Sequence, residues 1–258
     1  MRGTVAWITI APVKALALAE RDEVELEPFG VRGNRAFYLV DEDGRMVNGK
    51  VVGPLVGVVP AYDEATRSLA LVLPDGSTVR GDVEVGEAVT SDFWGRLVAG
   101  RVVVGPWSEA LSELAGRPLR LARTERPGDG ADRGSRGGVS LVATASLGAL
   151  AEAAGVDRVD GRRFRMLFGV DGVPAHTEDA WIGRRVRIGT AVVRPLGNVG
   201  RCAVTTQNPD TGVPDLDTLR VLGEYRGEVE TSEPLPFGIW GEVVEPGRVR
   251  LGDPVEVE

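Results

Sequence analysis

Residues 199–212 read VGRCAVTTQNPDTG and contain the only cysteine of the 258-residue chain, Cys202. Arg201 directly precedes it, and a neighbouring guanidinium favours the thiolate, the form of cysteine that attacks electrophiles and binds metals. The glycine-containing approach at residues 197–200 allows the backbone to come close to a ligand. A lone cysteine is also typical of an inert, buried side chain, so these residues alone leave both interpretations of Cys202 open.

The charge of the chain changes around this cysteine. Residues 180–209 contain no Asp or Glu, although acids make up about one residue in seven of the whole chain. Five arginines stand there instead: Arg184, Arg185, Arg187, Arg194 and Arg201. Because guanidinium groups bind phosphate with two hydrogen bonds, this concentration of positive charge favours a site for a small polyanion. The alternative is a solvated strand face whose arginines pair with acids from elsewhere.

The composition of the chain is that of a folded protein. Its 43% hydrophobic and 26% charged residues are ordinary globular values, and its length suffices for two domains of modest size. Gly contributes 35 residues, which predicts many tight turns and short elements. Of the 30 basic residues only Lys14 and Lys50 are lysines. Since an ammonium group differs from a guanidinium in shape and hydration, Lys14 is a candidate functional residue.

Several function classes are disfavoured by charge and cysteine content. The net charge of −8 opposes nucleic acid as the main partner, because phosphate backbones repel acidic surfaces. Neither a signal peptide nor an apolar run of about 18 residues is recognisable, so we expect a cytoplasmic protein without membrane contact. A single cysteine cannot form an intrachain disulfide, a four-cysteine zinc site or a protein-held iron–sulfur cluster. Any electron transfer is therefore expected to use another cofactor.

Short strands are predicted over most of the chain. Alternating apolar and polar residues predict strands at 4–10, 23–26, 36–40, 55–59 and 68–73, with hairpin turns at Asp43-Gly44 and Asp75-Gly76. Capping residues and helical periodicity predict helices at 108–115, 144–154 and 215–222. Further strands are predicted at 119–122, 139–142, 164–170, 184–194, 239–244 and 249–257. The pattern predicts a barrel or sandwich in the first hundred residues and an α+β, mainly β fold overall.

Residues 126–138 differ from the rest of the chain. They are rich in Gly, Asp and Arg and show no apolar periodicity, which predicts a mobile loop. Such a loop is either a lid over a site or a tolerated insertion.

The identity of the residues adds a family resemblance. The stretch at 199–212 closely resembles the signature of the MOSC domain, found in molybdenum cofactor sulfurases and in mitochondrial amidoxime-reducing components and their bacterial relatives. Near the start, APVK at 11–14 and GVRGNR at 30–35 resemble the paired motifs of the β-barrel domain that precedes MOSC in these proteins. Further similar motifs are VSL at 139–141, ASL at 145–147, RFR at 163–165, EDAWIG at 178–183, FG at 237–238 and GDPV at 252–255.

The resemblance implies both an architecture and a cofactor. It implies an N-terminal β-barrel domain over residues 1–100, packed on a β-rich MOSC domain with a few short helices over residues 101–258. It also implies a molybdenum–pterin cofactor (molybdopterin) whose metal is held by the thiolate of Cys202, the implied catalytic residue; a soft thiolate suits molybdenum. The implied cofactor-binding residues are Lys14, Arg35, Ser140, Arg165, Asn198, Gly200 and Arg201.

The sequence also departs from the relatives that reduce amidoximes. Those relatives often have Ser, Asn and Ser where this chain has Ala15, Leu167 and Gly200, and Asn34 stands where Asp is common. The lost polar side chains are expected to alter cofactor affinity or substrate choice more than the fold.

The implied activity is that of a molybdenum-dependent oxidoreductase that removes oxygen from N-hydroxylated small molecules. A separate reductase is expected to supply electrons, because no flavin, haem or iron–sulfur module is recognisable in the sequence. Two alternatives stay open at this point: sulfur transfer through a persulfide on Cys202, and a carrier that binds the cofactor without turnover. A monomer is favoured.

Overall fold

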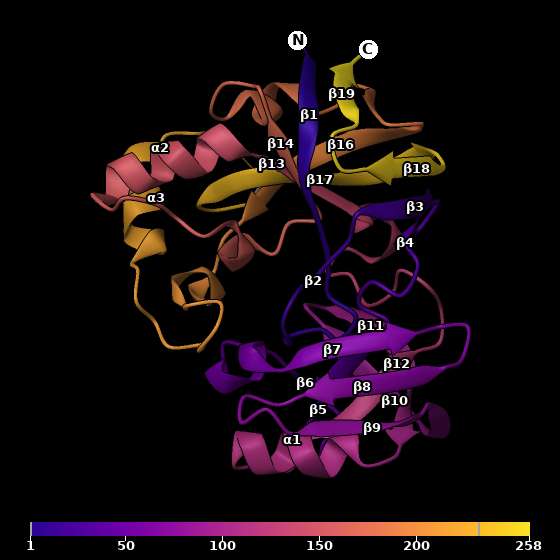
Figure 1. Cartoon of the computed structure of the whole chain (residues 1–258). Helices are drawn as coiled ribbons and strands as arrows, with labels where there is room; N and C mark the ends of the chain where they lie inside the picture. The colour runs from indigo at the N-terminus through magenta and orange to yellow at the C-terminus, as the bar shows by residue number, and fades with distance from the viewer. Residues whose placement is uncertain (1, 232) are drawn as a thin grey trace.

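The computed structural model describes residues 2–231 and 233–258 of the chain. In Figure 1 the strands form two groups, one near the two termini and one at the opposite end, and the termini lie close together. The first strand, β1 (Arg2–Ile10), runs from the termini toward the opposite end of the molecule. The chain therefore completes one strand of the first group before it enters the second.

The group near the termini is a closed barrel that includes this first strand. Its other strands are β13 (Val139–Ala143), β14 (Phe168–Asp171), β15 (Val186–Ile188), β16 (Ala191–Gly200), β17 (Pro236–Glu245) and β19 (Pro254–Val257). They pair in the order β14-β13-β17-β16-β15-β19-β1, and β1 pairs back onto β14. The register of β1 shifts between Val5 and Trp7, and such a bulge lets Val5 and Ile8 both face the core. We call β1 and residues 139–258 the barrel unit.

The opposite end consists of two further sheets, and we call residues 36–124 the N-terminal unit. One sheet contains β5 (Phe37–Val40), β6 (Met46–Val47), β10 (Glu84–Phe93), β11 (Arg96–Val104) and β12 (Arg120–Thr124), and the other contains β7 (Val59–Asp63), β8 (Ser68–Val72) and β9 (Thr78–Asp82). The helix α1 (Trp107–Ala115) contributes Trp107, which is fully buried in the core of this unit and donates from its indole to Leu69 O at 3.2 Å.

A small sheet joins early and late parts of the chain. It pairs β18 (Gly247–Arg250) with β3 (Glu23–Glu27), and β3 with β4 (Gly30–Val31). The two-residue strand β2 (Ala19–Glu20) pairs with the end of β1. These contacts fix the segment that leads from β1 to β5, which carries Lys14 and Arg35.

Two helices and most of the 3-10 turns accompany the barrel. In Figure 1, α2 (Thr144–Ala154) and α3 (Thr218–Arg226) lie beside each other along one side of it. The 3-10 helices are η1 (Gly53–Gly57), η2 (Gly134–Gly137), η3 (Gly161–Phe164), η4 (Thr177–Trp181) and η5 (Ala203–Thr206). α2 ends at Gly155, whose φ of 67° is left-handed, as its sequence predicts.

The predicted mainly β fold is confirmed, as are the hairpin turns at Asp43-Gly44 and Asp75-Gly76. The division expected at residue 100 falls inside β11, and β12 extends the same sheet to Thr124. The closed ring of strands lies in the barrel unit. The N-terminal unit consists of two sheets with a main core and a smaller buried cluster that includes Tyr38 and Phe93.

Some predicted elements have different bounds. The strand predicted at 55–59 begins only at Val59, because Pro54 starts a 3-10 helix there. The strand predicted at 164–170 begins only at Phe168, since Arg165 is left-handed. The helix predicted at 215–222 is α3, capped instead by the side chain of Asp217 and continuing to Arg226.

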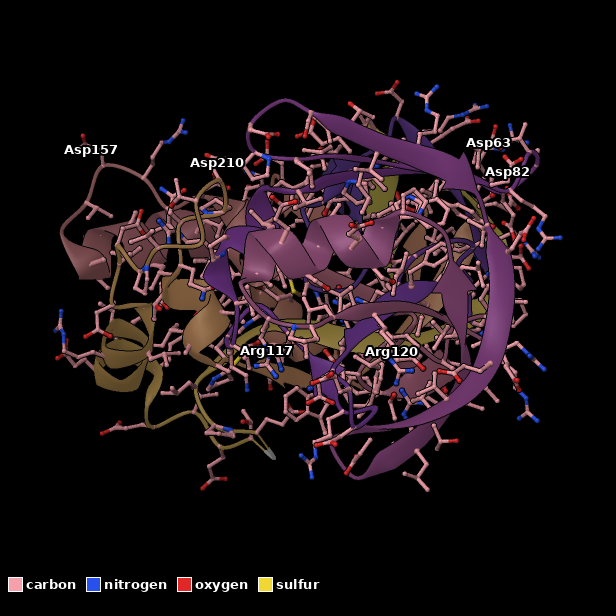
Figure 2. All side chains as sticks on the ribbon, turned by 90° about the horizontal axis from the view of Figure 1, so that it is seen from below. Asp63, Asp82, Arg117, Arg120, Asp157 and Asp210 are labelled. Atoms are coloured by element: carbon pink, nitrogen blue, oxygen red, sulfur yellow. The ribbon has the colours of Figure 1, made fainter. Side chains whose placement is uncertain are left out.

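The outer surface carries many charged side chains. Figure 2 shows Asp157 at one edge of the molecule and Asp63 and Asp82 at the other, projecting outward from the ribbon. Within residues 2–231 and 233–258, no helix combines the length and the apolar character that crossing a membrane requires.

Candidate functional site

A cavity of about 550 Å³ is lined by residues from both units. Lys14, Arg35 and Trp94 come from the first hundred residues, whereas Arg165, Arg201 and Cys202 come from the barrel unit. The remaining lining residues include apolar side chains such as Leu18, Val56 and Val204 and amides such as Asn48 and Gln207. The cavity is within the size range of small-molecule and cofactor sites.

Most of the predicted site residues meet at this cavity. Its lining includes Lys14, Arg35, Ser140, Arg165, Gly200, Arg201 and Cys202. Asn198 is not among the lining residues; it is buried, and its side-chain amide donates to Asp179 Oδ1 at 2.6 Å. Asn198 thus contacts the interior of the barrel unit. The roles of all eight residues as cofactor or metal ligands stay predictions.

Cys202 lies at the point where β16 gives way to η5. Its carbonyl oxygen accepts from the amide of Thr205 at 3.0 Å and from the Thr205 hydroxyl at 3.1 Å, which fixes the backbone of this turn. The cysteine is exposed. Of the two interpretations of Cys202, the inert buried side chain is therefore wrong.

Arg201, which precedes Cys202, is held by neutral groups. Its guanidinium donates to Phe237 O and to Phe164 O, both at 2.9 Å, and lies 5.1 Å from the Phe164 ring centroid. Burial lowers the pKa of Arg201 to about 9, against the raising effect of Cys202. The guanidinium is thus still charged near pH 7 and places a fixed positive charge beside the thiol.

The other arginines of the acid-free stretch have a different role. Arg185 and Arg187 pair with Glu258 at 2.8 and 2.5 Å, and Arg194 donates to Glu242 at 3.0 Å. Arg184 donates to the carbonyl of Glu258 at 3.1 Å. For these four residues the alternative of a solvated strand face is correct, and only Arg201 faces the cavity.

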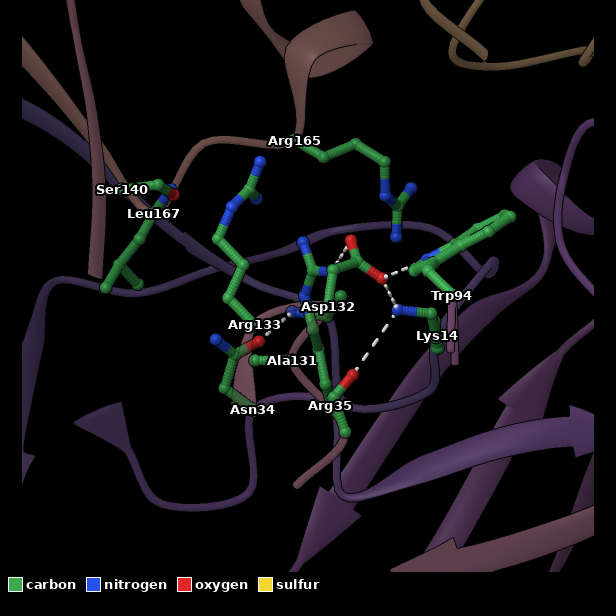
Figure 3. Close-up of polar contacts among 12 residues, drawn as sticks. Lys14, Asn34, Arg35, Trp94, Ala131, Asp132, Arg133, Ser140, Arg165 and Leu167 are labelled. Carbon is green, nitrogen blue, oxygen red and sulfur yellow. Dashed lines mark hydrogen bonds and ion pairs between the residues drawn. The ribbon is translucent and has the colours of Figure 1, made fainter. Parts of the chain in front are cut away.

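A second cluster of charges surrounds the carboxylate of Asp132, as Figure 3 shows. Lys14 Nζ and Arg35 both pair with this carboxylate, Arg35 at 3.1 Å, and the indole of Trp94 donates to it at 3.1 Å. Burial alone would raise the pKa of Asp132, but Lys14 and Arg35 outweigh it and hold the pKa well below its usual range. Asp132 is therefore ionised throughout the physiological range.

The buried cations of this cluster exceed its negative charge. Burial, with a smaller contribution from Arg35 and Arg165, lowers the pKa of Lys14 to about 8 despite Asp132. Burial and Arg35 lower the pKa of Arg165 to about 10; its guanidinium points toward Asp132 in Figure 3 and donates to Leu16 O at 2.8 Å. Three cations around one carboxylate leave an excess of positive charge that fits an additional dianion, such as a phosphate monoester.

Backbone strain is concentrated at the cavity. Ala15, Arg35, Trp94 and Arg165 line it and have φ values of 77°, 54°, 58° and 52°, in the left-handed region that favours glycine. Such conformations persist only where the surrounding structure enforces them, and they are typical of functional sites. This observation is independent of charge and points to the same cavity.

The loop predicted at 126–138 forms part of the wall. It carries Ala131, Asp132 and Arg133 into the lining. The Arg96 guanidinium donates to Asp129 O and Ala131 O, both at 2.6 Å, and Arg133 pairs with Glu233. The loop is thus attached to both units. The sequence did not predict three residues of this site, because neither periodicity nor a motif identifies Asp132, Arg133 or Trp94.

The three departures that lose a polar side chain all lie in the cavity wall, as does the fourth departure, Asn34. Ala15, Leu167 and Gly200 belong to the lining, so their lost hydroxyl and amide groups make this wall less polar. At Gly200 the structure also gives a local reason. Its amide donates to Glu233 Oε2 at 2.9 Å, and an added Cβ would approach Glu233 Cβ to 2.8 Å.

Comparison with known families identifies both parts of the chain. The MOSC N-terminal beta barrel domain matches residues 2–110, and the MOSC domain matches residues 132–256. The chain belongs to the MOSC family, in the group in which the MOSC domain follows this N-terminal domain.

Individual relatives match nearly the whole chain. The human mitochondrial amidoxime-reducing component 1 is 28% identical over 98% of this chain and 82% of its own length. The human mitochondrial amidoxime reducing component 2 is 30% identical over 98% of this chain and 83% of its own length. Among solved structures, the YuaD protein of Bacillus subtilis covers 100% of this chain and 96% of its own, with a TM-score of 0.46 and 13% identity.

Proposed function

We propose that this protein holds a molybdenum–pterin cofactor in the cavity and reduces N-hydroxylated small molecules. The observation that carries the proposal is the exposed thiol of Cys202 in the same cavity as the excess of buried positive charge around Asp132. The similarity to amidoxime-reducing components supports the choice of reaction.

The residues present fit such a cofactor. A soft thiolate suits molybdenum, and Cys202 supplies one thiol at an accessible position. Lys14, Arg35 and Arg165 would bind a phosphate monoester, because their charges exceed that of Asp132. Arg201 would place a fixed positive charge beside Cys202. When bound, the cofactor would supply the two-electron chemistry that no side chain of the protein can provide.

The chain itself would bind and orient the substrate. Conversion of an N–OH group to N–H consumes two electrons and two protons and releases water. The apolar residues Leu18, Val56 and Leu167 and the exposed ring of Trp94 line the cavity and offer contacts to the body of such a substrate. We infer that a separate reductase supplies the electrons. A monomeric state and a cytoplasmic location stay predictions.

The proposal is tested by assaying reduction of an aromatic amidoxime to the amidine, with a chemically reduced viologen as electron donor. The unmodified protein is expected to form amidine, and Cys202→Ser is expected to form none. Arg117→Gln serves as the control, since Arg117 is an exposed residue outside the lining of the cavity. Unchanged turnover in Cys202→Ser, or no turnover by a protein shown to contain the cofactor, would contradict the proposal.

The exposure of Cys202 also favours a second candidate, sulfur transfer through a persulfide. Incubation with a cysteine desulfurase and cysteine, followed by intact mass spectrometry, distinguishes the two. A product one sulfur atom heavier, absent in Cys202→Ser, would support sulfur transfer. Tight cofactor binding without amidoxime reduction would instead indicate a cofactor carrier.

A further inference from the structure

A second cavity, of about 540 Å³, is lined mainly by the N-terminal unit, and Cys202 is not among its lining residues. Its walls come from the turn between β4 and β5, from β7, β10, β11 and β12, and from the start of the 126–138 loop. Asn34 lines both cavities, whereas none of the charged residues around Asp132 lines this one. The proposed function assigns no role to this second cavity.

Arg123 of β12 is the distinctive residue of this cavity. Its guanidinium carbon lies 5.8 Å from the ring centroid of Phe37 and 5.7 Å from that of Tyr62, so the side chain is held against two aromatic rings. In the part of the chain that the structure describes, Arg123 has no hydrogen-bond acceptor and no acidic partner. Every other half-buried or buried arginine of these residues donates to a carboxylate or a carbonyl.

The ring of Tyr62 lies against this guanidinium, and its hydroxyl is also unpartnered among the described residues. It is buried, and among the described residues no atom forms a hydrogen bond with it. Burial raises the pKa of Tyr62, against the lowering effect of Arg123, so the phenol keeps its proton and can act as a donor. A buried donor without an acceptor is unfavourable, and Tyr62 lines the cavity, so an acceptor bound there would satisfy this hydroxyl.

The charges of the cavity wall define the expected ligand. Glu125 lies 3.8 Å from Arg101, and Glu64 lies 3.9 Å from Arg32, whose guanidinium also binds Glu27 at 2.7 Å. Of the three arginines in this wall, Arg123 is the one without an ion pair among the described residues, so its guanidinium is available to a ligand with a single negative charge. A guanidinium presents two parallel N–H groups that fit a planar carboxylate, and a nearby hydroxyl can donate to the same group.

The rest of the wall is suited to an apolar body. Phe29, Val31, Val85 and Pro127 line the cavity, and Val85 is 42% exposed although it is a large aliphatic residue. We propose that this second cavity binds a small organic carboxylate with an apolar body, whose carboxylate is held by Arg123 and Tyr62.

Isothermal titration of the full-length protein with benzoate tests this proposal, with benzamide as the neutral isostere. Benzoate is expected to bind at least about tenfold more tightly than benzamide, since a hydrogen bond to a charged group is stronger than one between neutral groups. Arg123→Gln is expected to lower benzoate affinity about tenfold or more, with little effect on benzamide. Tyr62→Phe is expected to lower it by a smaller factor.

Arg80→Gln is the matched control, because Arg80 is an exposed arginine of the same unit outside the cavity. It is expected to bind benzoate like the unmodified protein. Thermal unfolding of each variant verifies that the fold is retained, and Tyr62→Phe provides an independent variant if Arg123→Gln does not fold. Equal affinity for benzoate and benzamide, no benzoate binding, or undiminished binding in a folded Arg123→Gln protein would overturn the proposal.

Discussion

Lys14 shows how burial sets the chemistry of a single residue. The side chain is 9% exposed, and burial lowers its pKa to about 8 although Asp132 lies against it. An arginine would stay charged in the same place at any physiological pH. The lysine therefore makes the positive charge of the cluster dependent on pH in a range that experiments can reach.

We predict that anion binding at this cluster weakens as pH rises through about 8. Protonated Lys14 attracts an anion and neutral Lys14 does not, so the affinity is highest below this pKa. Sulfate is the suitable probe, because its own charge is constant over this range, and calorimetry at pH 7 and pH 9 measures the change. Lys14→Arg is expected to remove most of the pH dependence, and equal sulfate affinity of the unmodified protein at both values would contradict the prediction.

The site residues differ in how far the sequence could predict them. Lys14, Arg35, Arg165, Arg201 and Cys202 belong to short motifs, and all of them reach the cavity. The acid-free stretch predicted a polyanion site, but four of its five arginines bind partners on the surface of the barrel unit. The sequence pattern did not show this, because those partners lie elsewhere in the chain. Asp132 and Trp94 could not be predicted, because only tertiary contacts bring a loop residue and a hairpin turn to the same place.

At the scale of elements, apolar alternation predicted many of the strands that have one buried face, although it did not identify β11. The long hairpin of β10 and β11 was missed for the converse reason: most of β10 is exposed or half-buried, so its sequence has little apolar periodicity. The glycine-rich loop at 126–138 was located correctly. Its attachment through Arg96 and Arg133 was not predictable, because no local pattern encodes these partners.

Two glycines allow the roles of a helix and of this loop to be separated. In α2, Gly148 has no atom within 4 Å of an added Cβ, so Gly148→Ala is expected to stabilise the protein by about 0.5–1 kcal/mol through helix propensity. In the loop, an added Cβ at Gly130 would lie 1.8 Å from Arg35 O, so Gly130→Ala must displace the loop from the turn that carries Arg35.

Gly130→Ala is therefore expected to lower sulfate affinity and to destabilise the protein by about 1–3 kcal/mol. Urea unfolding of Gly148→Ala and of Gly130→Ala measures the two changes in stability against the unmodified protein. Calorimetry with sulfate measures the change in affinity. Unchanged sulfate affinity in Gly130→Ala would show that the loop does not position the cation cluster.

At the scale of the whole molecule, the two units are not consecutive in the chain. β1 closes the barrel by pairing with β14 and β19, although it precedes the N-terminal unit in sequence. The same strand continues directly into the segment that carries Lys14. The barrel and one wall of the cavity are therefore linked through one short stretch of backbone.

We predict that a fragment of residues 132–258 does not fold cooperatively, although it includes the whole MOSC match. Without β1 the edges of β14 and β19 are unpaired, and Val5 and Ile8 are missing from the barrel core. Urea unfolding followed by circular dichroism is expected to show no cooperative transition. A cooperative transition of the isolated fragment would disprove the prediction.

The molybdenum and pterin content of freshly purified protein, from a molybdenum-replete host, tests the central claim most directly. The claim is that Cys202 holds the metal and that the buried cations around Asp132 hold the phosphate of the same cofactor. We predict molybdenum and pterin in stoichiometric amounts in the unmodified protein and in Arg117→Gln, and loss of the molybdenum in Cys202→Ser. Absence of both from the unmodified protein, or unchanged molybdenum in Cys202→Ser, would contradict the account.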